Sequence, residues 1–228
     1  MIVIENKRVR NALKIIIPFV IIPVLGIIGS VSMTEKKHII ISLAATFFSL
    51  VLFSTGFEKK TTGSRRMVIT AVMIALCIVG RFIPFFKPVT AITIITAMYL
   101  GGEAGFLTGA LAAFLSNFYF GQGPWTPVQM RAWGLIGLIA GYIASPLKKH
   151  KAFLLFFGVF TGVLYSFIMD VWTVIWYDGS FKWELYTASI VAALPYTVLY
   201  AVSNFAFLWF LSKPFGEKLE RIKIKYGL

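Results

Sequence analysis

The chain has 228 residues, of which 58% are hydrophobic and 14% are charged, and its formal net charge is +13. Soluble domains contain about 45–50% apolar and roughly 25% charged residues, so this composition predicts an all-α polytopic membrane protein without a separate soluble domain. The one cysteine, Cys77, lies in an apolar run, which excludes a disulfide framework and a cysteine-based metal site.

Eight apolar runs are predicted to cross the membrane. They are residues 15–31, 39–57, 67–83, 89–100, 104–120, 126–144, 152–177 and 185–211, with a basic turn at 145–151 and a basic tail at the end. Eight crossings place both termini on one side, which then holds 16 of the 22 Lys and Arg residues, against 6 on the other. Because basic loops stay in the cytoplasm, we expect a multi-pass protein of the cell membrane with both termini cytoplasmic, and we expect no nucleic-acid partner.

Two breaks interrupt the later runs, at residues 84–88 and 120–127. The run between 89 and 100 forms a helix of only about 18 Å, whereas the hydrocarbon core is roughly 30 Å thick. Short or Gly/Pro-interrupted apolar segments mark the binding sites of transporters, because irregular backbone at membrane depth is tolerated only around a cavity. Both breaks fall on the outer side, which predicts one outward-facing cavity beneath two loops.

The second break is predicted to end in a helix N-terminus. Thr126 is the expected N-cap, Pro127 suits the first helical position, and Gln129 completes a capping box, with Arg131 just past the first turn. Free N–H groups and the helix dipole at this point favour a polar or anionic ligand group. The alternative is an ordinary interfacial loop whose tryptophans belong to the aromatic belt of the membrane.

Small residues recur every four positions in three runs, which indicates close helix packing. They are Gly101, Gly105, Gly109 and Ala113, then Gly137 and Gly141, and finally Gly158, Gly162 and Ser166 followed by Asp170. An ionisable residue inside an apolar run is a functional hypothesis by default. We expect Asp170 to pair with Arg81 or Arg131, either as part of a ligand site or as a structural ion pair.

Aromatic residues crowd the outer side, which suits a large, partly planar ligand as well as a membrane belt. They are Phe85, Phe86, Phe120, Trp125, Trp133, Trp172, Trp176, Tyr177 and Trp183. The sequence has no nucleophile–base motif, no metal-binding motif and no phosphate-binding glycine loop, so we expect a protein that is not an enzyme and holds no intrinsic cofactor or metal.

The order of these features resembles a known family. Six core spans, a broken second core helix and the segment from Asn117 to Met130, NFYFGQGPWTPVQM, resemble the S components of energy-coupling-factor (ECF) vitamin transporters, most closely the cobalamin type. The resemblance implies three parts: an N-terminal helix pair at 1–63, a six-helix core at about 64–212, and a basic cytoplasmic tail at 213–228.

The resemblance also implies a function and partners. An S component captures a vitamin, here cobalamin or a related corrinoid, and delivers it with a membrane-embedded T component and two ATPase subunits. S components dock on the T component through an A-x-x-x-A pattern, which Ala71 and Ala75 match here.

We therefore expect the substrate site among residues near the outer ends of the helices. They are Arg81, Phe85, Lys87, Gln122, Trp125, Gln129, Arg131, Trp133, Asp170, Trp172 and Trp176. Two alternatives remain open: an S component for another vitamin or a small precursor, and a membrane scaffold or assembly protein without a small ligand.

Overall fold

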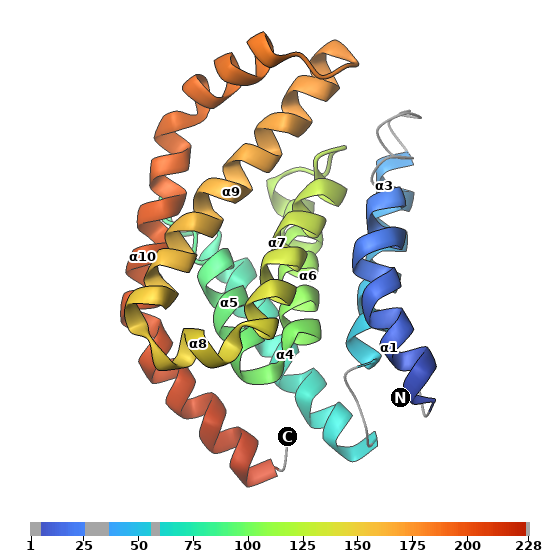
Figure 1. Ribbon diagram of the computed structural model, residues 1–228, viewed down its shortest axis with the longest axis vertical. Helices are drawn as coiled ribbons and strands as arrows, with labels where there is room; N and C mark the ends of the chain where they lie inside the picture. Colours follow the sequence, from blue (N-terminus) through green and yellow to red (C-terminus); the bar gives the residue numbers. More distant parts are fainter. Residues whose placement is uncertain (1–5, 26–36, 56–59, 227–228) are drawn as a thin grey trace.

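The computed structural model describes residues 6–25, 37–55 and 60–226, and these residues form helices and loops but no strand. The helices are arranged as one elongated bundle (Figure 1). In chain order they are α1 (Lys7–Ile16), the π-helix η1 (Ile17–Ile21), α3 (Lys37–Ser54), α4 (Lys60–Gly80), α5 (Val89–Leu100), α6 (Gly102–Phe120), α7 (Thr126–Tyr142), α8 (Ala144–Lys149), α9 (Lys151–Asp178) and α10 (Trp183–Tyr226).

The predicted all-helical fold is confirmed, whereas the number of membrane crossings stays a prediction. In the described part of the chain, α9 and α10 are long and apolar enough to cross a membrane; α5 and the segment Ile40–Ser54 are apolar but shorter. The predicted first span, residues 15–31, continues beyond the described residues.

The short helix α5 is the centre of the bundle. Eleven of its twelve residues, all but Tyr99, are buried, and it contacts α4, α6, α7 and α10. A helix that is apolar on every side belongs in an interior, which explains why this one does not need the length of a membrane span. It ends at Gly101, whose φ of 93° is accessible to glycine at little cost.

Helices α6 and α7 pack backbone to backbone through their glycines. A Cβ atom on Gly137 would stand 2.4 Å from the carbonyl carbon of Gly105, and one on Gly141 would stand 2.2 Å from Cα of Gly102. The third stripe does the same between α9 and α10, since Gly162 lies against the backbone of Tyr200. All three stripes of small residues therefore serve helix packing. Helices α9 and α10 form a hairpin, and they contact each other more extensively than they contact the other helices.

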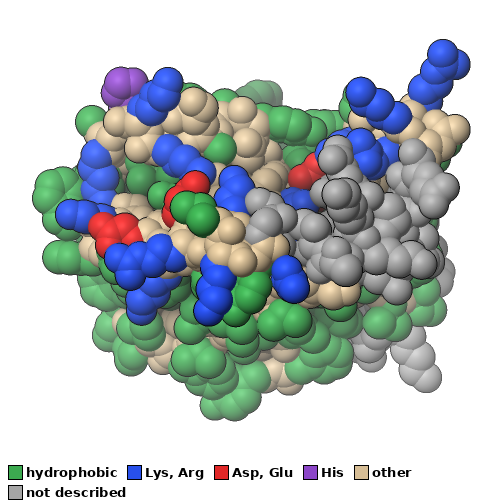
Figure 2. Space-filling model, turned by 90° about the horizontal axis from the view of Figure 1, so that it is seen from below, with side chains coloured by type: hydrophobic (Ala, Val, Ile, Leu, Met, Phe, Trp, Pro, Cys, Tyr) green, Lys and Arg blue, Asp and Glu red, His purple; other side chains and the backbone are tan. Residues whose placement is uncertain are grey.

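Of the N-terminal helices, α3 lies against α6 and α7 (Figure 1). Lys14 of α1 forms an ion pair of 2.6 Å with Glu103 of α6, and Arg66 of α4 stands 3.5 Å from the same carboxylate. This group joins the N-terminal pair to the predicted six-helix core at the end of the bundle that carries both termini. Seen from that end, Lys and Arg side chains gather around a few Asp and Glu side chains (Figure 2).

Three element boundaries differ from the predictions. Helix α4 begins at Lys60, well before the apolar run; the basic turn contains the short helix α8; and the basic tail continues α10 to Tyr226. The residues beyond these apolar runs are charged or polar, so a boundary drawn from hydropathy stops short of the helix. Even Pro214 lies inside α10, where Lys151 of α9 donates to the backbone oxygens of Leu208 and Trp209 in the preceding turn.

Candidate functional site

The start of α7 differs from the predicted capping box. The N-cap is Trp125, without a side-chain cap bond, and the helix begins at Thr126. The Thr126 hydroxyl instead accepts from the backbone N–H of Gly123 and from the side chain of Asn117 in α6, and that same side chain also donates to Gln129. The local cap is lost because a neighbouring helix supplies a better partner for both side chains.

Asn117 is the centre of a network that we call the outer polar cluster: Arg81, Asn117, Thr126 and Gln129. Arg81 Nη1 donates to Asn117 Oδ1 over 2.8 Å, and Asn117 Nδ2 donates to Thr126 Oγ1 over 2.9 Å and to Gln129 Oε1 over 2.8 Å. The same guanidinium also donates to the hydroxyl of Ser116. One buried amide thus holds the end of α4, the end of α6 and the first turn of α7 together.

Aromatic rings continue this cluster toward the α9–α10 hairpin. The Arg81 guanidinium lies 4.7 Å from the ring centroid of Phe120 and 5.5 Å from that of Trp133. Trp133 is buried and stacks on Tyr165 of α9 at 4.7 Å with an interplanar angle of 3°, and Tyr165 meets Tyr200 of α10 edge-on at 5.4 Å. This series of rings connects α7 with both helices of the hairpin.

The break after α4 is held by Lys87. Its ammonium group donates to the backbone oxygens of Arg81 over 2.6 Å and Ile83 over 3.0 Å, so it caps carbonyl groups that the interrupted helix leaves unpaired. The same break contains Phe85, a non-glycine residue with φ of 63° whose side chain is 74% exposed. Backbone strain of this kind is found where surrounding contacts enforce it, and often at ligand sites.

The loop between α6 and α7 lies toward the end of the bundle opposite the two termini (Figure 1). Gln122 Nε2 donates to the backbone oxygen of Phe114 over 2.8 Å, whereas its Oε1 is buried and has no partner among the described residues. The ring of Trp125, 39% exposed, lies directly over Gly123, where a Cβ atom would stand 2.3 Å from it. Glycine at 123 is therefore needed for the ring to take this position.

Asp170 does not pair with either arginine that the sequence suggested. Its Oδ1 accepts from Ser189 of α10 over 3.2 Å, and its Oδ2 is buried without a partner among the described residues. The four-residue stripe turns Asp170 toward α10, whereas Arg81 turns toward α6. Arg131 is half-buried and forms no ion pair within the part of the chain that the structure describes.

Seven of the eleven expected site residues therefore form two groups. Arg81, Lys87, Gln129 and Trp133 meet around Asn117 and Phe120, while Asp170 and the stacked pair Trp172 and Trp176, with centroids 5.8 Å apart, belong to the hairpin. Gln122 and Trp125 lie in the loop, and Phe85 stands at the exposed tip of the break.

The sequence interpretation missed three residues that join these groups: Asn117, Tyr165 and Tyr200. A buried amide within an apolar run was a usable signal for Asn117, because polar groups at such depth need partners. Nothing in the periodicity distinguished Tyr165 or Tyr200 from membrane-belt aromatics. No group of three or more His, Cys, Asp or Glu residues that could hold a metal ion is present in the described ranges.

Comparisons with known proteins agree with this architecture. A protein-family model described as the ECF-type riboflavin transporter, S component, matches residues 62–213, which is more than half of the chain and includes α5, α6, α7 and α9. No curated protein and no solved structure matches the chain significantly. The matched segment leaves out the N-terminal helix pair and the end of α10.

Proposed function

We infer the function from the family, because the chain belongs to the S components of ECF transporters. An S component is a transporter subunit and not an enzyme. We propose that this chain captures a vitamin in the membrane from the outside and delivers it by association with a T component and two ATPase subunits.

Three unsatisfied polar atoms carry the proposal that the vitamin binds at the outer end. Gln122 Oε1, Trp133 Nε1 and Asp170 Oδ2 are buried and lack a hydrogen-bond partner among the described residues. Buried polar atoms are almost always paired, so each unpaired one calls for an explanation such as an absent ligand. Two of these atoms accept and one donates, which suits a ligand rich in carboxamide or imide groups.

The ligand must separate groups that are now in contact. Trp133 is 4% exposed, Asp170 6% and Trp172 8%. Trp133 belongs to α7 and Asp170 to α9, and the stack of Trp133 on Tyr165 joins these two helices, so a ligand that reaches both residues parts the hairpin from α7. The hairpin extends beyond the outer ends of α6 and α7, so it is placed to move over a ligand and cover it (Figure 1).

We propose cobalamin or a related corrinoid as the substrate. The resemblance of segment 117–130 supports this choice, as do the exposed aromatic rings of Phe85, Trp125, Trp176 and Trp183 around the outer end, which suit a large ligand. Riboflavin is the second candidate, because the family description names it and its planar ring suits the Trp133 stack.

Binding by the purified subunit tests both candidates. We expect cobalamin to raise the unfolding temperature of the detergent-solubilised protein at micromolar concentration, because a ligand that binds only the folded state stabilises it by mass action. Stabilisation by riboflavin and not by cobalamin would make riboflavin the preferred substrate. No stabilisation by any vitamin in a panel would favour the scaffold alternative.

A substitution of Trp125 tests whether the loop between α6 and α7 belongs to the vitamin site. Replacing Trp125 with alanine removes a half-exposed ring over the loop, and loss of an aromatic anchor typically costs ~2 kcal/mol or more, roughly a thirtyfold loss of affinity. Phe210→Ala removes another exposed ring at the opposite end of the bundle and should leave vitamin affinity unchanged. Equal affinities of Trp125→Ala and the unmodified protein would exclude the loop from the site.

The docking face for the T component is proposed on α4. Ala71 and Ala75 are both exposed on this helix, next to Val68, Val72 and Val79. Small residues on an exposed face allow a partner helix to approach closely, and packing of this kind drives helix association in lipid.

A further inference from the structure

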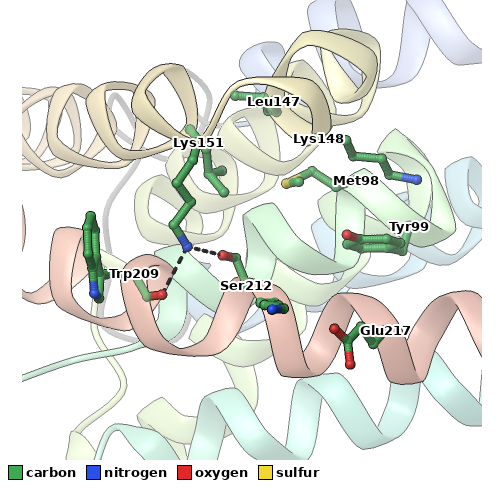
Figure 3. A pocket seen from close by; sticks show the side chains of 10 residues that line it. Met98, Tyr99, Leu147, Lys148, Lys151, Trp209, Ser212 and Glu217 are labelled. Carbon is green, nitrogen blue, oxygen red and sulfur yellow. Dashed lines mark hydrogen bonds between the residues drawn. The ribbon is translucent and has the colours of Figure 1, made fainter.

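A cavity lies toward the end of the bundle opposite the proposed vitamin site. It has a volume of about 540 Å³ and lies between α5, α8, α9 and α10 (Figure 3). Its lining combines three lysines and a carboxylate with aromatic and apolar side chains. The charged and aromatic members are Tyr99, Lys148, Lys151, Trp209, Lys213 and Glu217.

The three lysines differ in how far their ammonium groups are already hydrogen-bonded. Lys151 Nζ donates to two backbone oxygens of α10 and, over 2.6 Å, to Ser212 Oγ. All three of its N–H groups are therefore hydrogen-bonded, and it can act on a ligand in the cavity only through its positive charge. Lys148 Nζ lies 4.1 Å from the ring centroid of Tyr99 and forms an ion pair with Glu220 at 3.8 Å, a distance beyond an ordinary hydrogen bond. Lys148 and the exposed Lys213 therefore retain protons that can be donated to a ligand.

The mouth of the cavity continues into an apolar surface of α10. Val198, Val202, Phe205 and Trp209 are 43–54% exposed and follow one another at intervals of three or four residues, so they lie on one face of the helix. Trp209 belongs to both this face and the cavity lining. A ligand with a negative head and apolar chains would contact the lysines and this face at the same time.

We propose that this cavity binds the phosphate headgroup of an anionic glycerophospholipid, with its acyl chains along the apolar face of α10. Basic cavities between membrane helices on the cytoplasmic side are suited to such headgroups, and each lysine near an anionic membrane surface contributes about a fivefold gain in binding. The apolar face favours a lipid over a free phosphate compound, which would use the lysines alone. This inference does not depend on the vitamin.

Tryptophan quenching tests the site. The full chain is placed in phosphatidylcholine nanodiscs that contain increasing fractions of phosphatidylglycerol with brominated acyl chains, and the signal of Trp209 is obtained by difference from a Trp209→Phe variant. We expect Trp209 to be quenched at a lower fraction of brominated phosphatidylglycerol than of brominated phosphatidylcholine. The double variant Lys148→Gln with Lys213→Gln should abolish this preference, and Lys148→Arg with Lys213→Arg should retain it.

Matched controls separate a site from general attraction. Lys149→Gln with Lys218→Gln removes the same charge from the same two helices, but neither residue lines the cavity. An equal effect of the two double glutamine variants would overturn the proposal, because the attraction would then be that of the whole basic surface. Displacement by millimolar glycerol phosphate without any preference for phosphatidylglycerol would also overturn it and would identify a site for free phosphate compounds.

Discussion

Replacing Asn117 with alanine should loosen the outer end of the bundle, because one side chain makes all the hydrogen bonds that join Arg81, Thr126 and Gln129. The bond from a charged guanidinium contributes about 1.5–3 kcal/mol. The two neutral bonds contribute about 0.6 kcal/mol each, the average for side-chain bonds between membrane helices. The expected loss of unfolding free energy is therefore about 3–4 kcal/mol.

Asn204→Ala is the matched control for this change. Both asparagines are 1% exposed, but Asn204 makes a single described bond of 3.0 Å, to the backbone oxygen of Gly158. Its loss should cost about 0.6 kcal/mol beyond the packing loss that both variants share. The difference of about 3 kcal/mol corresponds to roughly 6–12 °C in melting temperature for a chain of this size.

The assay is thermal unfolding of the two variants in the same detergent, followed by a vitamin titration of each. We expect Asn117→Ala to melt well below Asn204→Ala and to bind the vitamin more weakly, because the loop and α7 lose their common support. Melting temperatures within about 2 °C of each other, with equal vitamin affinity, would show that the outer polar cluster neither stabilises the fold nor supports the site.

Two further predictions concern orientation and docking. With Cys77 replaced by serine, a cysteine at the exposed position Ser180 should react with an impermeant thiol reagent on intact cells, and one at the exposed position Ser145 should not; the reverse pattern would invert the orientation. Ala71→Trp with Ala75→Trp should abolish co-purification with the ATPase-bearing partners and vitamin uptake but leave vitamin binding intact, whereas normal assembly would refute this docking face.

The sequence predicted the elements better than their interactions. The interval between Pro88 and Gly101 defines α5 at both ends, because proline and glycine act locally. Hydropathy missed the charged ends of α4 and α10, where helix formation continues beyond the apolar run. The family match confirms the S-component resemblance, while the choice of cobalamin stays a proposal.

The site residues were predicted by type, but their partners follow from the packing of helices. Thr126 and Gln129 fit a local capping box, yet both side chains contact Asn117, which comes from another helix. Asp170 faces Ser189 because of its position around the axis of α9. Residue spacing shows that Asp170 shares a helix face with Gly158, Gly162 and Ser166, but it does not show which helix that face contacts. Contacts between helices depend on how the helices are oriented relative to one another, and the residues of a single apolar run do not specify that orientation.

The backbone contact between α6 and α7 also limits how this protein can evolve. Added Cβ atoms on Gly105, Gly109, Gly137 and Gly141 would approach backbone atoms of the facing helix to 2.9 Å or less, and backbone cannot rotate out of the way as a side chain can. Every missense change in a glycine codon introduces at least a Cβ atom. A library of random variants selected for folding should therefore retain glycine at these four positions, whichever vitamin its members have come to bind.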